Sequence, residues 1–217
     1  MRLFFGIAWA FILLPWTMLA QDTTLKLPFD FTSPTMVTSD GTNLYVTDFG
    51  AGTIVRIVTA TGETFAFAGS PGNQTELDDA GARAGFNKPF GIVSDGTNLY
   101  VSDFGGNTIR KVVIATGQVT TLAGSGTKTE ADGTGNSASF YGLAGLIGDQ
   151  TNLYVADDGG NTVRKLELTT GKVTTLAGSG KKGGQDGKRA EATFNIPKSL
   201  AINGSTLYIA EENRSAG

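Results

Sequence analysis

Asn98-Leu-Tyr-Val-Ser-Asp103 sets the pattern of the whole chain, because closely similar sequences occur at three other positions. The other copies read Asn43-Leu-Tyr-Val-Thr-Asp48, Asn152-Leu-Tyr-Val-Ala-Asp157 and Thr206-Leu-Tyr-Ile-Ala-Glu211. Successive copies lie 55, 54 and 54 residues apart. Self-similarity at a long fixed period is the sequence signature of a solenoid, a propeller or an array.

Short β-rich runs alternate with glycine-containing turns around this stretch. In the second copy we expect strands at residues 90–94, 99–102, 108–115 and 118–123. Turns at Asp95-Gly96, Gly105-Gly106 and Thr116-Gly117 join them, so each copy predicts a four-stranded antiparallel meander. The third run is apolar on both faces, which suits a sheet packed between two neighbours. A sheet of ~50 residues that stacks on copies of itself is a β-propeller blade, so the sequence predicts an all-β propeller.

The longer string from Phe86 to Lys111 resembles the NHL repeat. One departure from the pattern is Val55, which stands where the second and third copies have Arg110 and Arg164. The resemblance implies a six-bladed ring, which at this period needs roughly 320 residues. We therefore expect about three and a half blades of such a ring in this chain.

The chain divides into a leader and successive repeats. The divisions are 1–20, a signal peptide or N-terminal anchor; 21–30, an outer closing strand; 31–85, 86–139 and 140–193, three repeats; and 194–217, a partial fourth repeat. The leader has a positive start at Arg2, an apolar run and Pro15 to end that run, which predicts cleavage and export to the periplasm or the exterior. An uncleaved anchor stays open because Leu3 to Ala20 carries no charge. The partial fourth repeat predicts a truncated fragment, with a homodimer of half-rings as the alternative.

Composition excludes several kinds of site. The chain has 217 residues, with 17 basic and 20 acidic side chains and neither Cys nor His. Ser-His-Asp triads, thiol nucleophiles and imidazole metal sites are therefore excluded. The formal net charge of −3 argues against a nucleic-acid partner, because phosphate binding needs a concentrated basic surface.

Candidate binding residues lie in the turns after the second strands and in the loops that cross between blades. Loops on a rigid scaffold are where binding commonly occurs. Asp48, Asp103 and Asp157 end the second strands, where they would either ring a cation or serve the repeat itself. We favour the structural role, in which they accept hydrogen bonds from the following turn or pair with an arginine across the hairpin. The full candidate set on this loop face is Asp48, Asp103, Asn107, Asp157, Asp158, Asn161, Asp132 and Asp186. We interpret the other loop charges, such as Glu76, Asp78 and Glu130, as solvated side chains.

No set of catalytic residues is evident in the sequence. We therefore expect an exported binding module that recognises a protein, peptide or glycan on the loop face, with no cofactor and no membrane contact beyond an N-terminal anchor. The alternative is an enzyme, because some six-bladed relatives resemble calcium-dependent lactonases whose Glu, Asn and Asp ligands do not require histidine. In that alternative Ca²⁺ would be bound, and the site would lie in blades outside this sequence.

Overall fold

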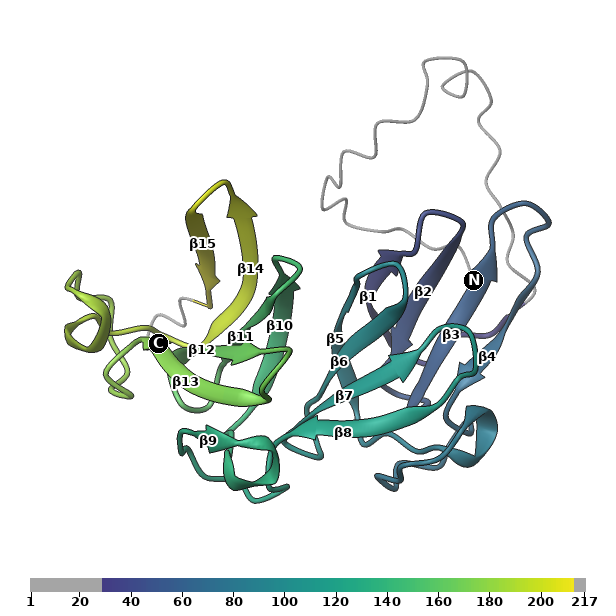
Figure 1. Ribbon diagram of the computed structural model, residues 1–217, viewed down its shortest axis with the longest axis horizontal. Helices are drawn as coiled ribbons and strands as arrows, with labels where there is room; N and C mark the ends of the chain where they lie inside the picture. The colour runs from purple at the N-terminus through teal and green to yellow at the C-terminus, as the bar shows by residue number, and fades with distance from the viewer. Residues whose placement is uncertain (1–28, 213–217) are drawn as a thin grey trace, which may run out of the picture.

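The computed structural model describes residues 29–212 as four β-sheets that follow one another in chain order across the molecule (Figure 1). The first sheet contains β1 (Pro34–Ser39), β2 (Asn43–Asp48), β3 (Thr53–Val58) and β4 (Thr64–Ala68). The second contains β5 (Pro89–Ser94), β6 (Asn98–Asp103), β7 (Thr108–Val113) and β8 (Val119–Ala123). The third contains β10 (Leu143–Gly148), β11 (Asn152–Asp157), β12 (Thr162–Glu167), β13 (Lys172–Ala177) and the short β9 (Gly133–Thr134). The fourth pairs β14 (Pro197–Asn203) with β15 (Thr206–Glu211).

The predicted four-stranded antiparallel meander is confirmed in the first three sheets. One boundary was wrong, because β7 ends at Val113 and not at residue 115. The backbone N–H groups of Thr116 and Gly117 both donate to the Val113 carbonyl oxygen, so the turn begins two residues earlier than expected. The sheets form an open arrangement, and the chain is a partial β-propeller.

The first turn of each of the first three blades is fixed by an aspartate. Asp40 Oδ1 accepts hydrogen bonds from the backbone N–H groups of Thr42, at 2.7 Å, and Asn43, at 2.6 Å. Gly41, which lies between Asp40 and Thr42, has φ +91°, a left-handed conformation that glycine adopts without strain. Asp95 and Asp149 accept the equivalent backbone hydrogen bonds in the next two sheets.

The blades pack through their innermost strands and their apolar faces. Strand β5 contacts both β1 and β10, and β10 contacts β14. Tyr45 and Tyr100 are buried in successive inter-blade cores, as expected for a residue that recurs once per repeat. A buried hydroxyl also crosses each of the first two boundaries. Thr47 Oγ1 donates to the Phe90 carbonyl oxygen at 2.7 Å, and Ser102 Oγ donates to the Ala144 carbonyl oxygen at 2.6 Å.

The loops that cross from one blade to the next lie beside the turns that follow the second strands, as predicted. Gln74 Nε2 donates to the Gly50 carbonyl oxygen at 2.9 Å. The loop then reaches the outer edge of the next sheet, where the Val119 N–H donates to the Asp79 carbonyl oxygen at 2.8 Å. In the next copy, β9 pairs with β13 in the same way. This pairing covers an edge strand that would otherwise present unpaired backbone groups. The loops contain single turns of 3₁₀-helix, named η2 (Gly81–Arg83), η3 (Gly135–Ser137) and η4 (Arg189–Glu191).

The predicted leader, most of the closing strand at 21–30 and the last five residues lie outside the described residues. Among residues 29–212, no helix has the length and apolar character needed to cross a membrane.

Candidate functional site at the crossover-loop face

A buried arginine joins each of the first two crossover loops to the blade that follows it. The Arg110 side chain is fully buried on β7. Its Nη2 lies 2.6 Å from Asp78 Oδ1, and its Nη1 lies 3.6 Å from Glu76 Oε1 and 3.4 Å from Asp103 Oδ2. The guanidinium also lies over the Phe86 ring, 5.3 Å from its centroid. One cation therefore gathers two carboxylates from the preceding loop and one from its own blade.

The third blade repeats this arrangement around Arg164. Its guanidinium nitrogens lie 2.9 Å from Asp132, 3.4 Å from Asp157 and 3.8 Å from Glu130. The interpretation of Glu130 as a solvated charge was therefore wrong, as it was for Glu76 and Asp78, and Asp132 from the candidate set pairs with Arg164. These carboxylates form ion pairs with an arginine of the following blade. The sequence of one repeat does not show which residues of the next repeat lie beside it.

The strand-end aspartates serve the repeat itself. Asp48 is fully buried and accepts backbone hydrogen bonds from Thr32 and Ser33, both at 2.8 Å. Asp157 accepts the corresponding hydrogen bond from the Gly142 N–H at 2.8 Å. Most of these donors precede the first strand, whereas we expected them in the turn after the second. The carboxylates hold the entry of each blade against its second strand, and their burial favours the structural role over contact with a ligand.

Burial also changes the protonation of two of these aspartates. It raises the pKa of Asp103 to about 7, although the Asn87 N–H and the Arg110 guanidinium oppose the shift. The pKa of Asp157 rises to about 6 for the same reason, opposed by the Tyr141 N–H. Asp103 Oδ1 is buried and has no hydrogen-bond partner among the described residues, so its charge is poorly compensated.

The other predicted residues fall into two groups. Asn107 and Asn161 have φ of +53° and +51°, at the turn position where the first copy has Gly52 with φ +71°. Asparagine tolerates this left-handed conformation better than most residues, so both fit a backbone role. Asp186 is exposed, one repeat beyond Asp132, and no ion pair involves it within residues 29–212.

Unlike the strand-end aspartates, the side chains at the inner end of the crossover-loop face differ from one repeat to the next. We call it the inner rim, and it consists of Phe49, Phe90, Phe104, Asp158 and Lys198. Phe49 lies edge-on to Phe90 with ring centroids 6.4 Å apart, and 6.1 Å from the Phe104 centroid. In the third and fourth copies, the positions of Phe49 and Phe90 are taken by Asp158 and Lys198, whose charged groups lie 2.5 Å apart.

The inner rim therefore has an aromatic half on the first two blades and a charged half on the last two. The three phenylalanines are half-buried, and Lys88 is exposed with its Nζ 6.0 Å from the Phe49 centroid. We predicted only Asp158 of this set. Aligning the copies gives the missing signal, because the residue after each strand-end acid reads Phe49, Phe104, Asp158 and Glu212.

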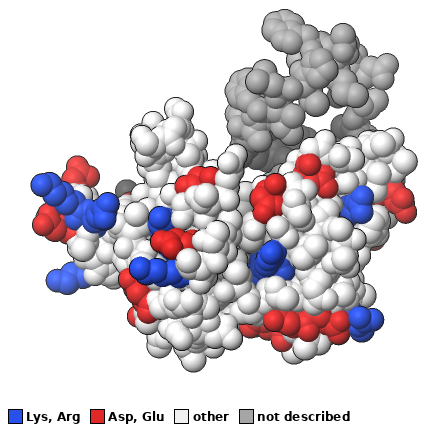
Figure 2. All heavy atoms as spheres, in the orientation of Figure 1, with Lys and Arg blue, Asp and Glu red and all other residues white. Residues whose placement is uncertain are grey.

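The charged side chains on the visible face lie in separate groups of both signs. Figure 2 shows the longest run, which is acidic, along the lower edge of the molecule with basic side chains at its end. Within residues 29–212, no three acidic side chains are arranged to hold a metal ion.

Comparison with known proteins places this arrangement in a family. No family model matches the chain. It is 32% identical over 168 residues to NHL repeat-containing protein 2 of Bos taurus, which covers 70% of this chain and 23% of that protein. The chain belongs to the NHL-repeat β-propellers. It spans about a quarter of the length of the curated NHL relatives it matches.

Solved structures share the same propeller fold. A structural genomics protein of unknown function from Bacteroides thetaiotaomicron matches with TM-score 0.65 and 29% identity, over 81% of this chain and 44% of that one. An auxiliary nutrient binding protein from Bacteroides ovatus matches with TM-score 0.64 and 24% identity, over 82% and 45%. At 24% identity, the similarity to the nutrient binding protein shows only that the two chains share a fold.

Proposed function

We propose that this NHL chain is part of an exported propeller that binds a protein, peptide or glycan at the inner rim of its crossover-loop face. The observation that carries the proposal is the aromatic half of the rim, where Phe49, Phe90 and Phe104 cluster with part of each ring exposed. Partly exposed aromatic rings supply contact area at low entropic cost, which is why aromatic residues are enriched at binding interfaces.

The division of the rim supports a ligand with two unlike parts. An apolar group or the face of a sugar ring would lie against Phe49 and Phe104. A polar group would reach Lys88 or the ion pair between Asp158 and Lys198. The buried Arg110 and Arg164 are excluded from this role, because both side chains are fully buried and their Nη2 groups already contact carboxylates of the preceding loops.

Two further points agree with a binding role. One solved structure with this fold is an auxiliary nutrient binding protein from Bacteroides ovatus, so the fold accommodates such a function. The first twenty residues have the pattern of a secretory signal, so the proposed ligand is extracellular or periplasmic.

Phe104→Asp tests the proposal, because the third copy carries Asp158 at the same position and the turn therefore accepts the change. Ligands that the unchanged chain captures from peptide and glycan arrays should bind the variant at least tenfold more weakly. The matched control is Phe65→Thr. It removes a phenylalanine that is 37% exposed on β4, and the second copy has Thr120 at that position. Equal loss in both variants, or no loss in Phe104→Asp, would contradict binding at the inner rim.

A further inference from the structure

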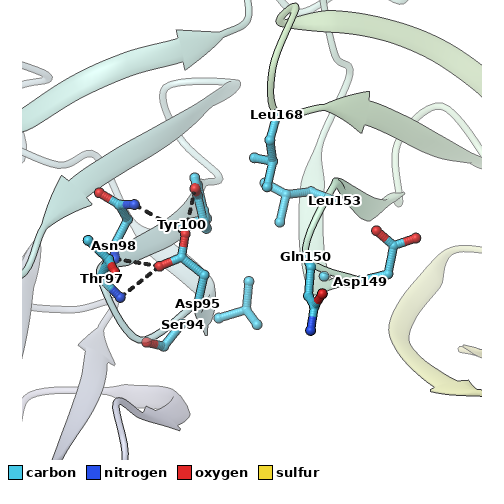
Figure 3. A pocket seen from close by; sticks show the side chains of 11 residues that line it. Ser94, Asp95, Thr97, Asn98, Tyr100, Asp149, Gln150, Leu153 and Leu168 are labelled. Atoms are coloured by element: carbon cyan, nitrogen blue, oxygen red, sulfur yellow. Dashed lines mark hydrogen bonds between the residues drawn. The ribbon is translucent and has the colours of Figure 1, made fainter.

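A cleft of about 720 Å³ opens between the second and third blades, at the end of the strands opposite the crossover loops. One wall is the turn between β5 and β6, including Ser94, Asp95 and Thr97. The other is the turn between β10 and β11, including Asp149 and Gln150. Figure 3 shows Leu153 and Leu168 on the third blade facing Tyr100 across the gap. The volume is in the range of small-molecule sites.

Three positions at this boundary depart from the repeat. At the first boundary, the Ser94 N–H donates to Thr38 Oγ1 at 3.2 Å and joins the two blades. At the second, the same positions hold Gly148 and Val93, and valine has no hydroxyl to accept that hydrogen bond. The outer strand also carries a smaller side chain. Phe67, which packs on Tyr45 with centroids 5.4 Å apart, is replaced in the next blade by Leu122.

A fourth departure puts an amide at the cleft and costs stability. Gln150 has φ +78°, at the turn position where the first two copies have Gly41 and Gly96. A non-glycine residue held in this conformation costs about 1 to 2 kcal/mol. Backbone strain of this kind is concentrated at functional sites, where the surrounding structure holds it in place.

The lining combines an apolar floor with ionised carboxylates in the flanking turns. Val93, Leu153 and Leu168 line the floor, and none of the lining residues is Lys or Arg. Burial alone would raise the pKa of Asp95, but the N–H groups of its own turn hold that pKa below the usual range. The same balance lowers the pKa of Asp149, where the Tyr154 hydroxyl and Asn152 are the leading donors. Both carboxylates therefore stay ionised, and their hydrogen-bonding capacity is used within their own turns.

We propose that this cleft binds a small organic ammonium ion, whose apolar body lies on Leu153, Leu168 and the Tyr100 ring while its charge is attracted by Asp95. Gln150 lines the same cleft, where its side-chain amide can hydrogen-bond the ligand. The site goes beyond the binding proposed at the inner rim, because it lies at the opposite end of the strands and uses none of the same residues.

Three probes with one body and different charges test the charge preference. They are 2-phenylethylammonium, 2-phenylethanol and phenylacetate, added to the full chain and followed by amide NMR shifts. We expect the ammonium ion to shift the amides of Gly148 and Gln150 with at least tenfold higher affinity than the alcohol, and phenylacetate to leave them unchanged. Equal shifts with all three probes would overturn the proposal, and so would shifts at these amides with glucose but not with the ammonium ion.

Variants that restore the repeat test the location. Val93→Thr with Gly148→Ser gives the second boundary the residues of the first, and a Cβ at Gly148 meets nothing nearer than 3.3 Å. We expect the affinity for 2-phenylethylammonium to fall at least tenfold. Gln150→Gly should weaken binding severalfold while raising the melting temperature, which separates a functional residue from a structural one. The control Asp40→Asn alters the equivalent turn of the first blade and should bind as the unchanged chain does. Unchanged affinity in the double variant would overturn the assignment.

Discussion

The boundary between the first and second blades and the boundary between the second and third are alike at one end and different at the other. Both have a buried hydroxyl crossing in the middle, from Thr47 in one case and Ser102 in the other. At the end with the crossover loops, Arg110 and Arg164 each collect carboxylates from the preceding loop. At the far end, a hydrogen bond joins the first pair of blades, whereas a cleft separates the second pair.

The difference shows how a repeat protein accommodates a site. At the crossover-loop end, an arginine and its carboxylates recur in the second and third copies. At the far end, the turn aspartates Asp40, Asp95 and Asp149 recur, whereas positions between the blades, such as Val93, do not. Departures from the repeat between the blades therefore leave the hydrogen bonds within each turn intact.

The largest loss of stability is expected from Arg110→Ala, which removes the ion pairs at the crossover-loop end of the first boundary. This variant leaves Asp103 and two loop carboxylates without their cation. Removing one partner of a buried ion pair costs about 3 to 5 kcal/mol of the free energy of unfolding. Urea unfolding measures this loss. Lys111→Ala at the next position is the control, because Lys111 is partly exposed and forms no ion pair among the described residues. A loss below about 1 kcal/mol would show that the loop is held by other contacts.

The same end is expected to respond to pH through Asp103. Its pKa is about 7 in the folded chain, whereas an ordinary aspartate has a pKa of 3.8, so between these values the folded state holds a proton that the unfolded state has lost. The free energy of unfolding therefore falls as the pH rises through this window. Asp103→Asn removes that proton and should flatten the slope by up to about 1.4 kcal/mol per pH unit. Urea unfolding from pH 4.5 to 7.5 tests it. Asp40→Asn should leave the slope unchanged, because the pKa of Asp40 is lowered.

A smaller effect is expected at the middle of the second boundary with Ser102→Ala. Ser102 Oγ donates to the Ala144 carbonyl oxygen and accepts from the Gly91 N–H at 2.8 Å, so both buried groups would lose a partner. The cost is about 1 to 3 kcal/mol. Ser125→Ala, at an exposed loop position, should cost far less in the same unfolding measurement. Equal costs would mean that the buried hydroxyl does not join the blades.

The smallest effect, and the one that sharpens the comparison most, is expected from Thr38→Val. It gives the first boundary the residue of the second and removes the acceptor of the Ser94 N–H. We expect a loss of about 0.5 to 1.5 kcal/mol and faster hydrogen exchange at the Ser94 amide. Unchanged protection of that amide would show that the hydrogen bond does not keep the first boundary closed.

The sequence by itself determined the period, the four strands of each blade and the turns between them. These features depend on residues close together in the chain, such as Asp95 with Asn98, and each copy repeats them. It also indicated that strand-end aspartates such as Asp103 serve the structure and pair with an arginine of the same hairpin. The second and third copies each contain both members of that pair, so one of these repeats was enough to predict it.

Only the tertiary structure decided which residues of different blades meet. Asp78 reaches Arg110 across 32 positions of sequence, and Phe49 reaches Phe90 across a blade boundary. The cleft likewise needs Val93 and Gly148 on two facing blades. A repeat pattern describes one copy, whereas these contacts depend on the packing between copies, because side chains from separate sheets come together only when the blades stack.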